Sequence, residues 1–279
     1  MENRNAMELF KARWAEGKFV CVGLDSEYAK LPESVKASGN VGEAIITFNK
    51  AIVDATKDLV CAYKPNSAFY EAQGPVGLLA LKATVEYINQ VAPGVPVILD
   101  AKRADIGNTN NGYVTFAFDW LGVDAITVHP YLGKEALKPF LDRVDKMIIV
   151  LARTSNPGAG EFQDLKVDGT PMYQIVAKQV ATQWNTNGNC AVVAGATYPE
   201  ELGEIRKLVG DLPLLIPGIG KQGGDLEKAV HNGRDSRKQG MIINNSSGVL
   251  FASMGPDFAQ AAQAVAQKMH NDITIFNQQ

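Results

Sequence analysis

Eight short apolar runs, each followed by a loop and a helical segment, constrain the fold of this chain more than any other feature. In the segments 42–57, 77–90, 133–141 and 199–208, apolar residues recur with the helical period of 3.6. The runs themselves are continuous in Val, Ile and Leu, which is typical of strands buried on both faces of a parallel sheet. They lie at 19–24, 59–63, 95–99, 125–128, 147–151, 191–194, 214–216 and 241–243.

Eight strand–helix units favour an α/β fold of the (β/α)8 TIM-barrel type, with an open doubly wound sheet as the main alternative. No linker-like or low-complexity tract divides the 279 residues, so we expect a single domain over 1–279. The longest irregular stretch, 154–170, is rich in Gly, Pro and Asn and is expected to be a lid. Arg153, just before it, could contact phosphate or the lid, or form a salt bridge.

Composition restricts the classes of partner. Lys and Arg number 27 against 30 Asp and Glu, whereas nucleic-acid binders usually show a basic excess. No apolar stretch reaches membrane-spanning length, and residues 1–18 lack the core of a signal peptide. Cys21, Cys61 and Cys190 lie in apolar runs and suggest reduced core residues. No Cys or His pair has metal-ligand spacing. We therefore expect a cytoplasmic protein with no metal, no nucleic acid and no membrane partner.

Polar residues cluster directly after the apolar runs. In a βα barrel the loops that follow the strands share one mouth, and active sites lie there. The turns from helix to strand carry no comparable set. The sequence therefore predicts a single polar site at this mouth, and the residues that point to it are Asp25, Lys64, Asp100, Lys102, His129, 154–156 and 218–222.

The run from Asp100 to Asp105 carries the sharpest chemical signal. Because strand side chains alternate with a period of two, Asp100 and Lys102 should project to the same side, and Asp105 follows in the loop. Flanking carboxylates favour the protonated form of a lysine, and an ammonium in a dry site can stabilise a carbanion and then protonate it. On spacing alone a structural ion pair explains the run equally well. Lys64 and Asp25 add two more charges at the same mouth. Buried charge networks are costly, so stability alone does not explain this number of charged residues.

These motifs resemble those of orotidine 5'-monophosphate decarboxylases. The stretch DAKRADIGNT, residues 100–109, is similar to the family signature, and KPNSAFYE, residues 64–71, to the second-strand motif of its longer bacterial branch. Segments 23–25, 154–157 and 217–225 follow in the family order, so the resemblance covers essentially the whole chain. The first signature is shared with a wider superfamily, and its combination with Lys64 and the Gln222 segment is more specific.

The resemblance implies an enzyme that converts orotidine 5'-monophosphate to uridine 5'-monophosphate in de novo pyrimidine synthesis, with no cofactor. Lys102 would then protonate C6 of the pyrimidine, and Asp100 would lie beside the substrate carboxylate. Lys64 would bind Asp100 and the ribose. Asp25 would bind the ribose hydroxyls, and Ser155 the amide edge of the pyrimidine.

The resemblance also implies a homodimer with shared active sites. Asp105, Ile106 and Thr109 would reach from each subunit into the site of its neighbour. The position of Asp105 in the loop, past the end of its strand, is compatible with that role. The remaining substrate contacts would come from the subunit's own strand ends.

A phosphate site is expected in the glycine-rich loop after the seventh run. Gly218 and Gly220 would let backbone amides approach a phosphate, and Gln222 would contact it. The family places an arginine on the phosphate after the eighth strand, and Ser247 stands at that position here. We expect Lys221 to replace that arginine in part.

Three alternative functions remain open at the level of sequence. A magnesium-dependent sugar-phosphate lyase of the same superfamily, such as a hexulose-phosphate synthase, resembles this chain over 100–105, although the Lys64 ammonium disfavours a metal beside it. A Schiff-base aldolase would need Lys64 or Lys102 as a neutral amine, which the neighbouring aspartates oppose. A non-catalytic phosphate-binding barrel is supported only by Ser247.

Overall fold

A closed parallel barrel forms the centre of the computed structural model, which describes residues 4–37, 39–220 and 222–279. The strand order is β2-β1-β10-β9-β8-β5-β4-β3, and each neighbouring pair is parallel. The bridges Tyr63–Val97 and Asn66–Asp100 join the two ends of this order. The strands are β1 Val20–Gly23, β2 Val60–Lys64, β3 Ile98–Arg103, β4 Ala125–Val128, β5 Met147–Arg153, β8 Cys190–Ala194, β9 Leu214–Ile216 and β10 Met241–Asn245.

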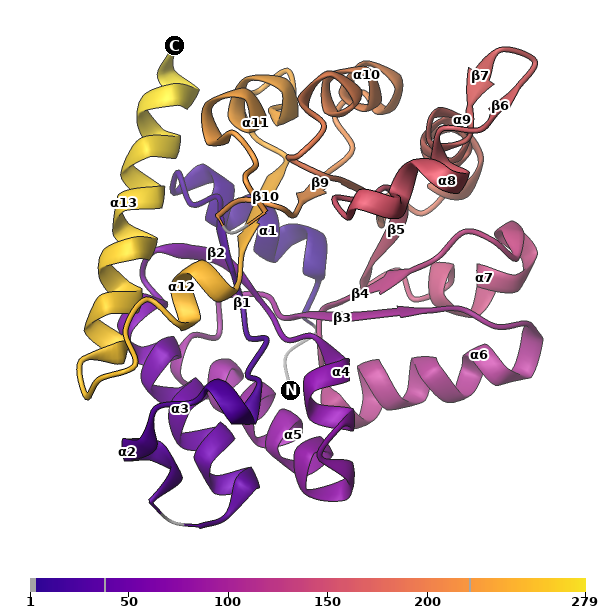
Figure 1. Ribbon diagram of the computed structural model, residues 1–279. Coiled ribbons are helices and arrows are strands. Elements are labelled where there is room, and N and C mark those ends of the chain that lie inside the picture. Colours follow the sequence, from indigo (N-terminus) through magenta and orange to yellow (C-terminus); the bar gives the residue numbers. More distant parts are fainter. Residues whose placement is uncertain (1–3, 38, 221) are drawn as a thin grey trace.

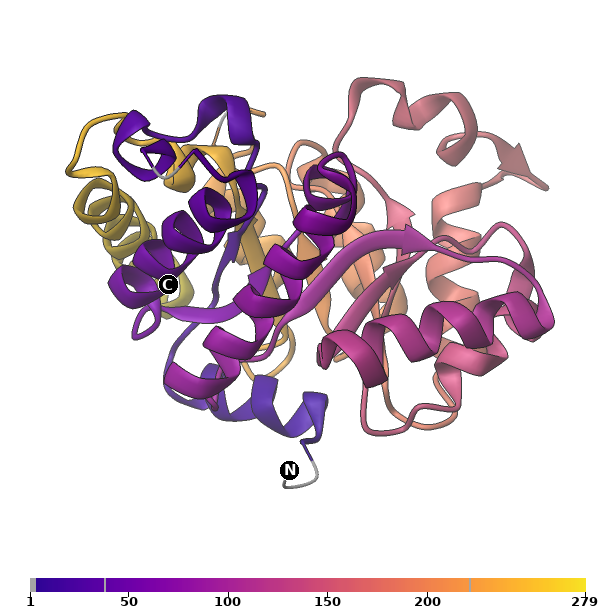
Figure 2. The same cartoon turned by 90° about the horizontal axis from the view of Figure 1, so that it is seen from below.

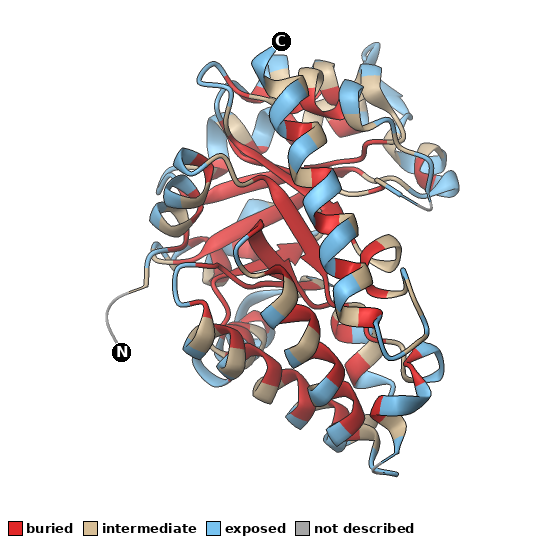
Figure 3. Ribbon diagram, turned by 90° about the vertical axis from the view of Figure 1, so that its left-hand side faces the viewer, coloured by how far each residue is buried: buried red, intermediate tan, exposed pale blue. Residues whose placement is uncertain are grey.

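Helices surround the barrel on its outside (Figures 1 and 2). The longer helical elements are α1 Ala6–Ala15, α3 Val41–Thr56, α5 Gly74–Val91, α6 Gly107–Val114 with the π-helix η2 Thr115–Leu121, α7 Gly133–Leu141, α9 Met172–Gln179 with the π-helix η4 Val180–Trp184, α10 Pro199–Val209, α11 Leu226–Gly233 and α13 Phe258–Gln278. Each turns an apolar stripe toward the strands, which are buried, and its polar face outward (Figure 3). This is the (β/α)8 TIM barrel that the eight runs predict.

Short elements occupy the loops of the barrel. They are η1 Tyr28–Lys30, α2 Glu33–Lys36, α4 Ser67–Glu71, η3 Pro157–Ala159, α8 Gly160–Gln163 and α12 Ser247–Leu250, together with the antiparallel pair β6 Lys166–Val167 and β7 Thr170–Pro171. The expected lid, 154–170, therefore contains a helical turn followed by a small hairpin. Figure 1 shows that hairpin standing out from the barrel.

The third strand starts later and runs further than the apolar run 95–99 predicts. Pro96 has no N–H, and the N–H of Val97 is donated to the buried carboxylate of Asp124, at 2.9 Å, so regular pairing begins only at Ile98. At its other end the strand continues through polar residues, because Arg103 still pairs with Val128 of β4. A pattern of apolar residues cannot mark a strand end that faces a polar cavity.

Two further sequence predictions can be compared with the fold. Cys21, Cys61 and Cys190 are buried and free, as their places in apolar runs predict. Within the described ranges, none of the helices combines the length and apolar character that a membrane span requires.

Candidate active site

A cavity of about 630 Å³ opens at the carboxyl ends of the strands. Every strand of the barrel contributes to its wall, either through its last residues or through the loop that follows. Eight residues predicted for the site lie in this wall, namely Asp25, Lys64, Asp100, Lys102, Ser155, Gly218, Gln222 and Ser247. Residues that are 222 positions apart in sequence therefore surround one space.

Four other predicted residues do not line this cavity within a single chain, and one lies outside the described residues. Asp105 accepts the N–H of Ile106, at 2.7 Å, and the Ile106 side chain is 62% exposed. Thr109 lies on α6, and a Cβ on Gly220 would lie 3.0 Å from Asn245 Oδ1. Lys221 falls outside the described residues. Among the described residues Asp105 forms no ion pair with Lys102, which it follows by three positions in the sequence.

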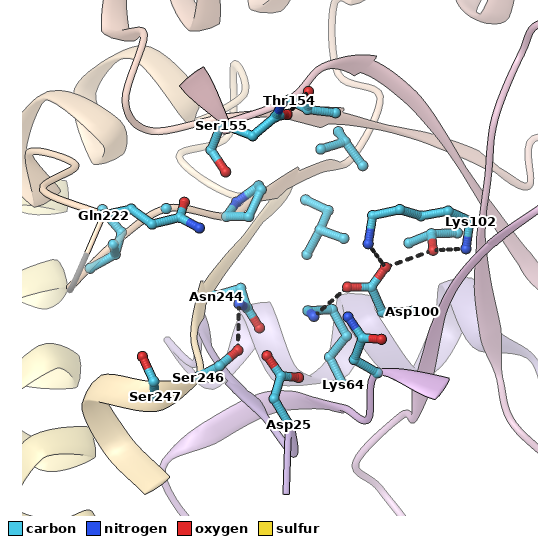
Figure 4. Close-up of a pocket in the computed structure, with 18 of the residues that line it drawn as sticks. Asp25, Lys64, Asp100, Lys102, Thr154, Ser155, Gln222, Asn244, Ser246 and Ser247 are labelled. Carbon is cyan, nitrogen blue, oxygen red and sulfur yellow. Dashed lines mark hydrogen bonds and ion pairs between the residues drawn. The ribbon is translucent and has the colours of Figure 1, made fainter. Parts of the chain in front are cut away.

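Three ionised side chains meet at the ends of β2 and β3, and we call Lys64, Asp100 and Lys102 the charge array. Lys64 Nζ lies 2.8 Å from Asp100 Oδ2, and Lys102 Nζ lies 2.6 Å from Asp100 Oδ1 (Figure 4). The side chains of Lys64 and Asp100 are 4% and 11% exposed, whereas that of Lys102 is 48% exposed toward the cavity. All three line the cavity, and Lys102 is the most exposed member of the array.

Attraction within the array outweighs the cost of burying it. Burial alone would lower the pKa of Lys64, but the carboxylates of Asp100 and Asp25 raise it above its usual value. Burial alone would raise the pKa of Asp100, but the ammonium groups of Lys64 and Lys102 lower it well below the usual range. Lys64 and Asp100 are consequently both charged at neutral pH.

The backbone at Lys102 departs from regular strand geometry. Lys102 has a φ of +48°, and the register of β3 against β4 shifts between Leu99 and Arg103. The N–H groups of Ala101 and Lys102 both donate to Thr127 Oγ1, at 3.0 Å each. Asp100 and Lys102 thus converge through a bulge that Thr127 holds, and regular alternation is the wrong explanation for it. A non-glycine residue at such a φ is strained, and such strain is common at active sites.

Thr127 also completes the array, since its hydroxyl donates to Asp100 Oδ1 at 2.9 Å. With Lys64 on Oδ2 and both Lys102 and Thr127 on Oδ1, the carboxylate accepts three hydrogen bonds. Sequence reasoning missed Thr127 because it sits inside an apolar run. The only indication in the sequence is that Thr127 is the one polar residue among positions 125–128.

The other side of the cavity presents buried oxygen atoms as acceptors. Asp25 Oδ1 and Asn244 Oδ1 are buried and have no hydrogen-bond partner among the described residues. Figure 4 shows both side chains beside Ser246, to which Asn244 Nδ2 donates at 3.2 Å. Buried acceptors in a native structure generally have a donor, so this wall suits a ligand that carries hydroxyl groups. The sequence analysis did not identify Asn244 or Ser246.

Glycines allow the β9 loop to approach its neighbours closely. Gly218 has a φ of +104°, and a Cβ there would lie 3.1 Å from Ser155 Cβ and 3.2 Å from Gln222 Oε1. At the end of β1, a Cβ on Gly23 would lie 1.9 Å from Ser246 Oγ. These close approaches bring the β1, β5, β9 and β10 loops together in one wall.

No group of three or more His, Cys, Asp or Glu side chains that could hold a metal ion occurs within the described ranges.

Comparison with known proteins gives one consistent result. The model of the orotidine 5'-phosphate decarboxylase / HUMPS family matches residues 18–265. An orotidine 5'-phosphate decarboxylase of Cupriavidus metallidurans is 49% identical over 96% of this chain and 97% of its own length. The solved structure of Leishmania donovani OMP decarboxylase superposes with a TM-score of 0.83 at 35% identity, covering 97% of this chain and 99% of that one. The structure of Leishmania donovani UMP synthase superposes with a TM-score of 0.87 at 36% identity. The matched region covers 98% of this chain and 57% of that longer one.

The Thr127 hydroxyl is expected to be necessary for the array. Thr127→Val keeps the shape but leaves two backbone N–H groups without an acceptor, so the free energy of unfolding should fall by about 2 kcal/mol. Catalytic efficiency should fall at least about tenfold, equivalent to ~1.4 kcal/mol of barrier. Thr127→Ser, which keeps the hydroxyl, should be near wild type. Denaturant melts and steady-state kinetics measure both quantities. Equal behaviour of the two variants would show that the hydroxyl is not what holds the bulge.

Proposed function

The chain belongs to the orotidine 5'-phosphate decarboxylase / HUMPS family, and from that premise we propose how its residues convert orotidine 5'-monophosphate to uridine 5'-monophosphate. The enzyme is a carboxy-lyase of pyrimidine synthesis. One observation carries the proposal for its mechanism: a lysine held at 2.6 Å by a buried carboxylate faces the cavity with about half of its side chain exposed, 48%.

The charge array supplies what this reaction requires. When the bond between C6 and the carboxylate carbon breaks, its electron pair stays on C6, where no adjacent group can delocalise it. A fixed ammonium beside C6 stabilises that pair, and its own proton then forms the new C6–H bond. Lys102 is the ammonium that reaches the cavity, and Asp100 holds it in place before substrate binds. Lys64 balances the charge of Asp100 so that the carboxylate remains buried and ionised.

The same arrangement disfavours the magnesium-dependent lyase. Magnesium prefers carboxylate and water oxygens in octahedral geometry. Both oxygens of Asp100 already accept hydrogen bonds, from Lys64 on one side and from Lys102 and Thr127 on the other. A cation at this carboxylate would have to displace two ammonium groups of its own sign.

Substrate contacts follow from the two walls of the cavity. Asp25, whose Oδ1 has no described partner, is placed to accept hydrogen bonds from ribose hydroxyls. Ser155 would bind the amide edge of the pyrimidine, and Gln222 and the amides near Gly218 the phosphate. Segment 154–170 would cover the substrate as a lid and exclude water.

We further propose a homodimer that works in the cytoplasm. The free, buried cysteines suit a reducing compartment. Asp105 and Ile106 lie outside the cavity of their own chain, and the large exposed fraction of Ile106, 62%, suits burial against a second copy. Asp105, Ile106 and Thr109 would then complete the site of the partner subunit.

The decisive test of function uses Lys102→Ala. Wild-type protein with excess EDTA should consume orotidine 5'-monophosphate, seen as a loss of pyrimidine absorbance. Lys102→Ala should keep the fold, seen as a single cooperative melting transition, and should lose nearly all turnover. A variant that retains activity within about tenfold, or ~1.4 kcal/mol of barrier, would refute the assignment of Lys102 as proton donor.

Shared active sites make a separate prediction. Lys102→Ala and Asp105→Ala homodimers should each be nearly inactive. After mixing and subunit exchange, a heterodimer contains one site that has lost both residues and one that retains both. Activity should therefore reappear in proportion to the heterodimer measured by native mass spectrometry. Exchange without recovered activity would mean that each subunit builds its site alone.

Ser247 allows the phosphate end of the site to be tested by adding a charge. Ser247→Arg should raise kcat/KM for orotidine 5'-monophosphate, because a hydrogen bond to a charged group contributes roughly 1.5–3 kcal/mol. Lys221→Ala should lower it by about ten- to a hundredfold, if that residue supplies the missing charge. Neither change should alter kcat/KM for orotidine, which lacks the phosphate. Equal effects on both substrates would place these residues away from the phosphate.

A further inference from the structure

A buried polar network adjoins Asp25 but lies outside the cavity. It joins the loop after β1 to the helices α3, α4 and α5, which Figure 1 shows grouped on one side of the barrel. Its members are Ser26 from the loop, Asn49 from α3, Tyr70 from α4 and Thr84 from α5, and each is at most 1% exposed. All four belong to the described residues, and none of them lines the cavity.

Asn49 is the centre of the network, and its amide is fully engaged. Its Nδ2 donates to Tyr70 Oη and to Thr84 Oγ1, at 3.0 Å each, and its Oδ1 accepts the hydroxyl of Ser26 at 2.5 Å. Because Tyr70 accepts from Asn49, its own hydrogen is donated to the carbonyl of Leu24, at 2.9 Å. Thr84 likewise donates to a carbonyl of its own helix. An amide turned the other way would take the hydrogen of Tyr70 from Leu24, so the network favours a single arrangement.

The network attaches to the chain on both sides of Asp25. Tyr70 binds the carbonyl of Leu24, which precedes Asp25, and Asn49 binds the hydroxyl of Ser26, which follows it. The N–H of Leu24 also donates to the end of β2, at 3.1 Å. Asp25 is therefore a single residue between two fixed neighbours, and Figure 4 shows its carboxylate directed into the cavity.

Stability alone does not account for polar side chains at these positions. Asn49 and Thr84 stand on the buried, mostly apolar faces of α3 and α5. Burial of an amide costs free energy that its hydrogen bonds recover only in part, and asparagine is less favourable than leucine within a helix. A leucine would fill nearly the same space as Asn49 without either cost. The geometry that the network imposes on the β1 loop explains these residues better.

We propose that Asn49 and Tyr70 are positioning residues for Asp25, and that the buried network sets the preference of the site for a ribose with free hydroxyl groups. The proposal rests on the proposed function in one respect, the role of Asp25 in binding those hydroxyls. Asp25 Oδ1 is buried and has no partner among the described residues. A hydrogen bond weakens steeply as its angle departs from linear, so this oxygen must be aimed before the ligand arrives. A loose β1 loop would lose that aim and leave contacts to the base and phosphate unchanged.

Two small substitutions remove one attachment each, and nucleotide binding measures the effect. Tyr70→Phe removes the hydrogen bond to Leu24, and Ser26→Ala removes the one to Asn49. Ribose preference is the Kd for 2',3'-dideoxyuridine 5'-monophosphate divided by the Kd for uridine 5'-monophosphate, both from calorimetry. In the wild-type protein, hydroxyls bonded to a carboxylate should make this ratio about ten to a hundred. Each variant should lower the ratio at least about threefold, through weaker binding of uridine 5'-monophosphate alone. Asp25→Ala should remove the preference.

Hydrogen exchange reports the order of the same loop without any ligand. The N–H of Glu27 donates to the carbonyl of Asp25 at 2.9 Å, so protection of this amide follows the order of the turn. Tyr70→Phe and Ser26→Ala should each speed its exchange by about tenfold. Because the readout needs neither nucleotide nor turnover, it tests the positioning of Asp25 independently of the proposed function.

Tyr63→Phe is the matched control for Tyr70→Phe. Tyr63 is equally buried, and its hydroxyl also donates to a backbone carbonyl, that of Val53 in α3 at 3.1 Å. It belongs to neither of the two attachments that flank Asp25. The control should therefore lower the melting temperature to a similar extent as Tyr70→Phe, and should change neither the ribose preference nor the exchange of the Glu27 amide.

The possible results separate the proposal from the function on which it rests. The proposal fails if Tyr70→Phe and Ser26→Ala both keep the wild-type ratio and exchange, because the network would then only stabilise the fold. It also fails if Tyr63→Phe changes the ratio as much as Tyr70→Phe does. An unchanged ratio in Asp25→Ala would refute the ribose role of Asp25 and overturn the proposal with it. Faster exchange in the two variants of a protein that bound neither nucleotide would refute the proposed function and support the positioning of Asp25.

Discussion

One buried carboxylate between two ammonium groups organises this active site. Asp100 would be unfavourable as a lone charge at the end of β3, because burial of an unpaired ion costs far more than a fold of this size can spare. Lys64 and Lys102 make it stable, and Asp100 in turn fixes the position of Lys102 at 2.6 Å. The array is therefore charged and in place before substrate binds, so little reorganisation is needed when charge develops at C6.

The barrel provides the array with its geometry and its dry environment. β2, β3 and β4 are neighbours, which brings Lys64, Asp100 and Thr127 together from three successive strands. Thr127 Oγ1 accepts hydrogen bonds from the backbone N–H groups of Ala101 and Lys102, and so holds Lys102 at a φ of +48°. On the opposite wall, the buried side chain of Arg153 pairs with Asp164, which lies on the loop that carries Ser155.

The fold was predictable because strands buried on both faces leave continuous apolar runs, and each of the eight runs overlaps a strand of the barrel. Residues at strand ends were also predictable, since every strand of a parallel barrel ends at one mouth. Contacts that depend on tertiary structure could not be predicted from the sequence. The bulge at Lys102 depends on a hydroxyl of the next strand, Asn244 continues an apolar run, and Asp164 meets Arg153 only after an irregular loop has turned back. Asp105 follows Lys102 by three positions in the sequence, yet the two side chains form no ion pair among the described residues.

The ionisation state of Asp100 tests the central claim most directly. The carboxyl carbon of this residue can be followed by 13C NMR in the free enzyme, with Asp100→Asn to assign its signal. If the two ammonium groups hold the pKa of Asp100 below the ordinary value of 3.8, the signal should show no protonation step from neutral pH down to that value. A step above 3.8, the outcome that burial without compensation would produce, would contradict the account of a permanently charged array.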